Sequence, residues 1–387
     1  MMIPYGRQSI SEEDIAAVEA VLRSDFLTQG PAVPRFEEAV AARVGCREAV
    51  AANSATSALH IACLALGLGP GDRLWTVPNT FVASANCGLY CGAAVDFVAI
   101  DAMTWNISVT ALERKLAAAK CAGTLPKVVV PGHLTGEPCD MAAIRRLGDA
   151  YGFRIIEDAS HAIGARVAGA PVGACRHSDI TVFSFHPVKI ITTAEGGMAV
   201  TNDTGLAERM RLYRSHGITR DTSAMTHAPD GPWYYQQIAL GFNYRMTDMQ
   251  AALGLSQMGR IDAFLARRHE IAQRYDRMLG GMPVVRPVRK PDRFSALHLY
   301  VVRVPKAQHG DVFGRMRAAG IGVNLHYIPV HLQPWYAGLG FRRGQFPEAE
   351  AYYAEAISLP IHAELTEADQ DRVVTALRTA LGETAPG

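Results

Sequence analysis

Two side chains near the middle of the chain have the chemistry to handle an amino group. Asp158 follows the apolar run 154–156, and Lys189 ends a polar turn that follows the apolar run 180–183. A lysine amine can form an imine with an aldehyde, and a carboxylate can keep a ring nitrogen protonated. Each residue alone is more often a solvated or turn residue, because Asp and Lys are mostly exposed in proteins. The pair gains meaning from a third element, a site for an anion.

That anion site is predicted at residues 53–59, Asn-Ser-Ala-Thr-Ser-Ala-Leu, which follow an apolar run and open a helical stretch. Backbone N–H groups at 55–57 and the hydroxyls of Thr56 and Ser57 can hold a phosphate at the positive end of the helix dipole. The alternative for this segment alone is an ordinary helix cap. Phe81 follows the next apolar run, where its ring can stack on a planar ligand or belong to the core.

Together the three elements are what pyridoxal 5'-phosphate (PLP) requires from a protein. The sequence therefore predicts that Lys189 forms the imine, that Asp158 pairs with the pyridine nitrogen, and that an amino donor displaces the lysine in a ping-pong transamination. The freed amine then moves a proton, which requires burial or nearby positive charge to lower its pKa.

These segments occur in an order and spacing that resembles the DegT–StrS group of sugar-nucleotide aminotransferases over nearly the whole chain. The shared motifs are NSATSAL (53–59), EDASHAIGA (157–165), FSFHPVK (183–189), AEGG (194–197), and the segments 27–31, 214–217, 243–248 and 326–329. Some members carry His at the lysine position and remove a hydroxyl instead. Lys189 therefore favours the aminotransferase branch.

The resemblance implies a role for each matching residue. The catalytic set is Lys189, Asp158 and His161, with His161 near the cofactor's phenolic oxygen. The implied phosphate ligands are Thr56, Ser57 and Ser184, while Phe81 stacks on the ring. Asn243 is expected to reach the phosphate of a neighbouring subunit, which makes a homodimer with shared active sites.

Within this group the chain looks most like the aminotransferases of the pseudaminic-acid pathway. That likeness implies L-glutamate as donor and UDP-2-acetamido-2,6-dideoxy-β-L-arabino-hex-4-ulose as acceptor. The residues expected to line the substrate cleft are Tyr5, Gln29, His326 and His331, with Arg245 as a candidate for the glutamate carboxylate. For the two histidines, a satisfied polar residue under a loop is an equal alternative. Other UDP- or dTDP-linked ketosugars, and a non-catalytic PLP-binding regulator, are the competing functions.

Composition excludes several other classes of function. The chain has 387 residues with 38 Lys plus Arg against 37 Asp plus Glu, so no bulk charge favours nucleic acid. No apolar stretch reaches the length of a membrane span, and no signal pattern opens the chain. The seven scattered cysteines lack zinc spacing, which indicates free thiols in a reducing cytoplasm and no metal.

The pattern of elements predicts an α/β protein, and the resemblance implies PLP fold-type I. Its large domain, residues 1–248, holds a mainly parallel sheet, and residues 249–387 form a linking helix and a smaller α+β domain. The predicted strands are 49–52, 73–77, 95–100, 127–130, 154–156, 180–183 and 197–201, with 299–304 and 323–327 in the small domain. The predicted helices follow Ser11 and span 37–44, 56–66, 141–151 and 249–279. A loop or β-excursion is expected at 219–237.

Overall fold

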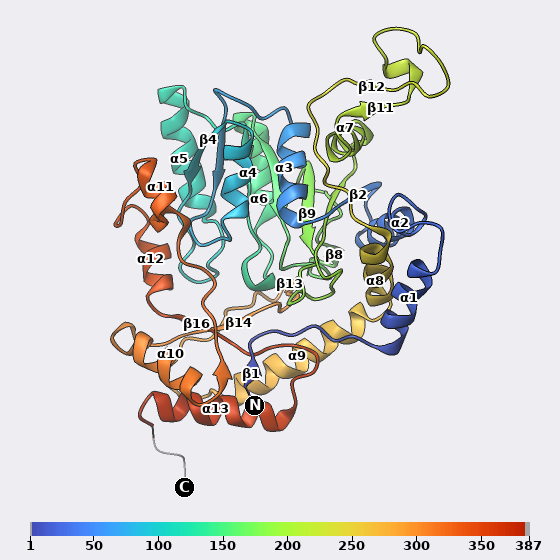
Figure 1. Cartoon of the computed structure of the whole chain (residues 1–387). Helices are drawn as coiled ribbons and strands as arrows, with labels where there is room; N and C mark the ends of the chain where they lie inside the picture. The colour runs from blue at the N-terminus through green and yellow to red at the C-terminus, as the bar shows by residue number, and fades with distance from the viewer. Residues whose placement is uncertain (1, 384–387) are drawn as a thin grey trace.

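A computed structural model describes residues 2–383, and its centre is a seven-stranded sheet (Figure 1). The strand order is β2-β10-β9-β6-β5-β3-β4, and β10 alone runs antiparallel to its neighbours. The strands are β2 (Glu48–Ala52), β3 (Arg73–Thr76), β4 (Ala94–Phe97), β5 (Val128–Val129), β6 (Arg154–Asp158), β9 (Ile180–Ser184) and β10 (Gly197–Thr201). The seven strands and the mainly parallel sheet are confirmed.

Helices cover both faces of this sheet, which explains why its strands read as continuous apolar runs. Val182 of β9 packs among α3, α4 and α7, whereas the next residue, Phe183, packs on the opposite face against α2 and α8. The helices of this part are α1 (Glu12–Leu22), α2 (Ala32–Val44), α3 (Ala55–Ala65), α4 (Ala83–Tyr90), α5 (Val109–Ala122), α6 (Met141–Tyr151) and α7 (Thr204–Arg214).

The starts of two of these helices depend on particular residues in the sequence. Ser11 and Asp14 form the capping box that starts α1, as predicted. Helix α2 starts at Ala32, earlier than the predicted 37, because Pro34 lies in its first turn, where a missing N–H does no harm.

The predicted single helix 249–279 is wrong, because two helices occupy this stretch. Helix α8 (Asp248–Met258) ends at Gly259, and α9 (Ile261–Met278) starts after Arg260. The backbone N–H of Arg260 bonds the carbonyl of Gln257, which closes the first helix. Apolar residues continue across the break at helical spacing, so periodicity alone could not reveal it.

Most of the remaining C-terminal elements pack around a second core, which includes Tyr275, Tyr300, Ile357 and Leu377. These elements are α10 (His309–Ala318), α13 (Glu367–Ala380), β14 (Tyr300–Arg303), β15 (Ile321–Gly322) and β16 (Ala356–Leu359). Helices α11 (Pro334–Gly338) and α12 (Pro347–Tyr353) pack instead against the large sheet, through Tyr336 and Tyr352 respectively. The first strand, β1 (Ile3–Pro4), pairs in parallel with β15, so the start of the chain joins this second core. The division at 248/249 stays a prediction.

The strand expected at 323–327 is also wrong. Only Ile321 and Gly322 pair as a strand, and Asn324 makes a single bridge to Ser358. The following residues leave the strand path and turn toward the large sheet, where His326 and Tyr327 line a cavity.

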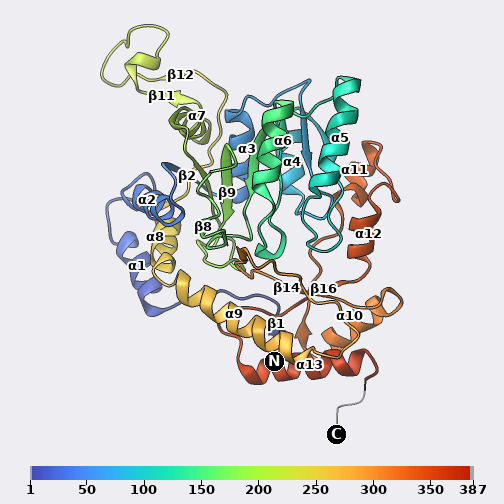
Figure 2. The same ribbon diagram turned by 180° about the vertical axis from the view of Figure 1, so that it is seen from behind.

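A small hairpin projects from the body of the molecule in both views (Figure 1, Figure 2). It consists of β11 (Ile218–Thr219) and β12 (Gln236–Gln237), which confirms the β-excursion expected at 219–237. Its Trp233 is 72% exposed. A second small sheet joins β7 (Arg166–Val167), β8 (Ala170–Pro171) and β13 (Arg293–Phe294). Within residues 2–383, no helix has both the length and the apolarity to cross a membrane.

Candidate active site

A cavity of about 580 Å³ opens where β6 and β9 end. This is the carboxyl edge of the parallel strands, where α/β sheets place their ligands. Residues of the large sheet and its helices line it, together with the segment 324–327 that follows β15. The predicted site residues that line it are Tyr5, Thr56, Phe81, Asp158, His161, Ser184, Lys189 and His326.

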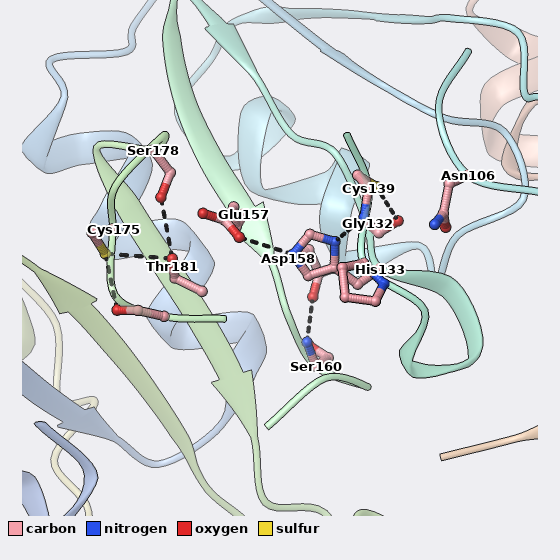
Figure 3. A network of polar contacts seen from close by, with 12 residues as sticks. Asn106, Gly132, His133, Cys139, Glu157, Asp158, Ser160, Cys175, Ser178 and Thr181 are labelled. Carbon is pink, nitrogen blue, oxygen red and sulfur yellow. Dashed lines mark hydrogen bonds and ion pairs between the residues drawn. The ribbon is translucent and has the colours of Figure 1, made fainter. Parts of the chain in front are cut away.

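Asp158 is the last residue of β6 and both of its carboxylate oxygens are hydrogen-bonded. Oδ1 accepts the backbone N–H of Ser160 at 3.1 Å (Figure 3), and Oδ2 accepts the hydroxyl of Ser84 at 2.5 Å. The side chain is only 8% exposed. Its orientation is therefore fixed, with its remaining lone pairs available to the cavity.

Lys189 lies in the turn after β9, where its N–H bonds the carbonyl of His186. Burial lowers the pKa of its amine to about 8, although the negative charge of Asp158 opposes this shift. A sizeable fraction of the amine is thus neutral near physiological pH, which a nucleophile or base requires.

The start of α3 forms the predicted anion cradle, with one correction. Ser54 is the N-cap and its Oγ accepts the backbone N–H of Ser57 at 3.1 Å. The Ser57 hydroxyl donates to Oδ1 of Asn53 at 2.6 Å, and Ser57 does not line the cavity. The expectation of a free N–H at Ser57 is wrong, because the cap uses it. Ser54, Ala55 and Thr56 do line the cavity.

Gly197 allows this cradle to exist. A Cβ on Gly197 would lie 2.5 Å from the backbone nitrogen of Ala55 and 2.5 Å from the carbonyl of Ser54. Only a residue without a side chain lets β10 approach the helix start so closely. Gly197, the last residue of the AEGG motif, therefore has a packing role at the cradle.

Histidines dominate the rest of the cavity wall. Nε2 of His161 lies 3.0 Å from the Tyr327 hydroxyl, and its ring centroid lies 4.4 Å from that of His298. Burial and the nearby charge of Lys189 lower the pKa of His161, His298 and His326, the last to about 3. These rings are neutral at physiological pH. Among the described residues that line the cavity, Lys189 is the only Lys or Arg.

A buried pair lies directly behind Asp158. Nε2 of His133 is 2.9 Å from Glu157, and the backbone N–H of Cys139 donates to His133 Nδ1 at 3.0 Å (Figure 3). Since Nδ1 accepts a hydrogen bond, the ring proton is on Nε2 and points to Glu157. Burial alone would raise the pKa of Glu157, but His133, Ser178 and Thr181 together outweigh it and lower this pKa. The pair stiffens the end of β6.

Besides Ser57, four predicted substrate or cofactor residues lie outside this cavity. Gln29 and Asn243 are both exposed. The segment of Gln29 is hydrogen-bonded to the start of α8, and Asn243 forms a β-bridge with Ser215. Arg245 is half-buried nearby in sequence and does not line the cavity. His331 is fully buried, and its Nε2 lies 2.9 Å from Glu350. It is therefore a buried, hydrogen-bonded histidine, as the alternative expected.

Sequence reasoning missed three residues that shape the site. Tyr327 was within the HYIP motif but received no role. His298 lines the cavity without a motif around it. Ser84 contacts Asp158 from 74 positions away, and a serine within a helical stretch gave no signal.

Comparison with known proteins identifies the family. The sequence profile of the DegT/DnrJ/EryC1/StrS aminotransferase family matches residues 8–378. The chain belongs to this family. It is 38% identical over 383 residues to the spore coat polysaccharide biosynthesis protein SpsC of Bacillus subtilis, a match that covers 97% of this chain and 96% of SpsC.

Solved structures agree with the sequence match. Helicobacter pylori PseC, described as an aminotransferase involved in the biosynthesis of pseudoaminic acid, superimposes with a TM-score of 0.90 at 31% identity, covering 99% of this chain and 100% of PseC. The sugar aminotransferase Spr1654 of Streptococcus pneumoniae in its PMP form also reaches 0.90, at 30% identity over 98% and 99% of the two chains. The protein is therefore a PLP-dependent sugar aminotransferase of fold-type I.

Proposed function

We propose that this enzyme moves the amino group of L-glutamate to C4 of UDP-2-acetamido-2,6-dideoxy-β-L-arabino-hex-4-ulose. The product is UDP-4-amino-4,6-dideoxy-N-acetyl-β-L-altrosamine. The meeting of Lys189 and Asp158 in one cavity carries the aminotransferase chemistry. The likeness to PseC supports the choice of sugar.

Some of the side chains bind the cofactor, and others hold or transfer protons. The start of α3, Thr56 and Ser184 hold the phosphate, and Phe81 packs on the ring. When bound, PLP supplies an electron sink for the charge left at the reacting carbon. Asp158 keeps the ring nitrogen protonated, and Lys189, with its lowered pKa, carries the proton between donor carbon and cofactor. His161 faces the phenolic oxygen of the cofactor.

Tyr5 and His326 are the proposed contacts to the sugar nucleotide. Their ring centroids are 5.1 Å apart on the cavity wall, and Nδ1 of His326 is held 2.8 Å from the hydroxyl of Ser358. A neutral histidine with one nitrogen fixed in this way can present the other to a substrate oxygen. A second candidate is another UDP- or dTDP-linked ketosugar, which the likeness to SpsC, a spore coat polysaccharide biosynthesis protein, supports.

The proposed enzyme is a homodimer with shared sites. The phosphate and the glutamate carboxylates need positive charge, and the described cavity wall offers only Lys189 among Lys and Arg. Exposed Asn243, with Gln29 and Arg245, is free to complete the cavity of a second copy. The cysteines resolved here are all free thiols, which fits the cytoplasm as the expected site of action.

Mixed dimers test the shared site. Lys189→Ala and Asn243→Ala chains, each inactive alone, are co-expressed with different tags. If sites are shared, the mixed dimer has one intact site, so the statistical mixture regains about a quarter of wild-type activity. Full inactivity of the mixture would show that each chain builds its own site.

The substrate test uses the purified enzyme with PLP, glutamate and a panel of 4-keto UDP- and dTDP-sugars. NMR of the products identifies the aminated sugar and the configuration at C4. The expected product is the altrosamine derivative, formed by wild type and absent with Lys189→Ala. Faster amination of a dTDP-sugar would replace the proposed substrate by the second candidate.

A further inference from the structure

A pair of buried hydroxyls, those of Thr80 and Ser84, lies beside Asp158. Ser84, in the first turn of α4, is 0% exposed and its Oγ is 2.5 Å from Oδ2 of Asp158. Thr80 Oγ1 lies 2.8 Å from Ser84 Oγ, and Thr80 lines the cavity. Three side chains thus form a continuous hydrogen-bonded row.

The direction of these bonds follows from the number of protons. An ionised carboxylate only accepts, so the single hydroxyl proton of Ser84 points to Asp158. Ser84 Oγ must then accept the proton of Thr80. The order Thr80 to Ser84 to Asp158 is the arrangement that satisfies every group in the row.

A second donor completes the arrangement. The backbone N–H of Ser160 bonds the other oxygen of Asp158 at 3.1 Å. Donors to both oxygens hold the carboxylate in one orientation. Its remaining lone pairs are thereby kept directed at the cavity, where a ring N–H can donate to them.

We propose that Ser84, ordered by Thr80, is a positioning residue that fixes Asp158 and keeps the shared proton on the cofactor's pyridine nitrogen. This inference rests on the proposed pairing of Asp158 with that nitrogen. Without Ser84, the carboxylate can rotate, and its hydrogen bond with the ring nitrogen weakens. The ring then withdraws electrons less strongly, and proton removal from glutamate slows.

The test compares wild type with Ser84→Ala and Thr80→Val, each loaded with PLP labelled with ¹⁵N in the ring. Ser84→Ala should shift the ring nitrogen resonance toward the unprotonated value and weaken PLP binding. The glutamate half-reaction should slow by about 10- to 100-fold, the effect of losing one hydrogen bond to a charged group, with little change in the glutamate KM. Thr80→Val should change the same quantities in the same direction, but less.

Thr76→Val is the matched control. Thr76 on β3 is equally buried, and its hydroxyl donates to the carbonyl of Val130 at 2.8 Å rather than to a site residue. It should lower the Tm without moving the ring nitrogen resonance. If Ser84→Ala behaves like Thr76→Val, with the ¹⁵N resonance, PLP affinity and half-reaction unchanged, Ser84 is a core residue and the inference fails.

Two further outcomes are also decisive. If Ser84→Ala does not fold, Thr80→Val carries the test, because its shape is nearly that of threonine, and an unchanged ¹⁵N resonance there overturns the inference. The ¹⁵N measurement needs no sugar. A wrong sugar substrate would therefore leave the inference standing, whereas Asp158→Asn with an unchanged ring resonance would refute both the pairing and the inference.

Discussion

The hydroxyl of Tyr327 lies 3.0 Å from Nε2 of His161, and both residues line the cavity. His161 follows β6 of the large sheet, whereas Tyr327 follows β15 near the second core. Burial, followed by the negative charge of Asp158, raises the pKa of the Tyr327 phenol, so it stays protonated. The contact orients a ring that faces the proposed cofactor.

Tyr327→Phe removes this contact while it keeps the ring. We expect a loss of about 1–3 kcal/mol in unfolding free energy, because Nε2 of His161 loses its buried partner. The glutamate half-reaction should also slow, since the His161 ring is no longer held. Urea unfolding and stopped-flow absorbance measure the two effects. Equal stability and rate in the variant would mean that the contact has no role.

The lowered pKa of Lys189 predicts how PLP uptake depends on pH. Only the neutral amine attacks the aldehyde, so the rate of uptake by apoenzyme should rise with pH through about 8 rather than through 10.5. In Asp158→Asn the midpoint should move lower still, because the opposing negative charge is gone. Absorbance stopped-flow across pH 6–11 checks this, and a wild-type midpoint near 10 contradicts it.

The same shift affects the stability of the apoenzyme. Below about pH 8 both folded and unfolded chains hold the lysine proton, and the buried charge disfavours the folded state. Between about 8 and 10.5 only the unfolded chain keeps it, so this group adds stability as pH rises. Lys189→Met apoenzyme should thus be more stable than wild type at pH 7, with a gap that narrows by pH 10.

Gly197→Ala tests the cradle at the start of α3. The added Cβ would lie 2.5 Å from backbone atoms of Ser54 and Ala55, so the helix start or β10 must shift. We expect about 1–3 kcal/mol of destabilisation and a clear loss of PLP affinity. Gly69→Ala is the control, because a Cβ there meets no atom within 4 Å. Unchanged PLP affinity in Gly197→Ala would show that the start of α3 does not bind the cofactor.

His326 and His331 should differ sharply when each is changed to Ala. His326 lines the cavity, so its loss should raise the KM for the sugar nucleotide. His331 is bonded to Glu350 in the core, so its loss should lower the Tm and leave that KM unchanged. Steady-state kinetics and thermal melts separate the two cases. A raised KM in His331→Ala would return this residue to the substrate site.

The sequence allowed prediction of those features that depend on neighbours along the chain. Asp158 and Lys189 each follow a buried run, so strand topology brings them to the same edge. The break at Gly259 escaped prediction because apolar periodicity continues through it. The segment 323–327 has the apolar composition of a strand but supplies the cavity wall instead.

Contacts between distant segments could not be predicted in this way. Ser84 and Asp158 are 74 positions apart, and nothing local distinguishes Ser84 from any helical serine. The placement of Gln29, Asn243 and Arg245 outside the cavity depends equally on tertiary packing. A second copy of the chain is needed to test their roles.

The pairing of β1 with β15 has a consequence for the order of events during synthesis. Ile3 leaves the ribosome long before its partner Ile321, because most of the described chain separates the two residues. Tyr5, two residues further on, reaches the cavity through that pairing. The nascent large sheet can form earlier, since domains tend to fold as they emerge. The segment around Ile3 therefore cannot pair with β15 until Ile321 has been made. Tyr5 accordingly joins the cavity wall late in synthesis.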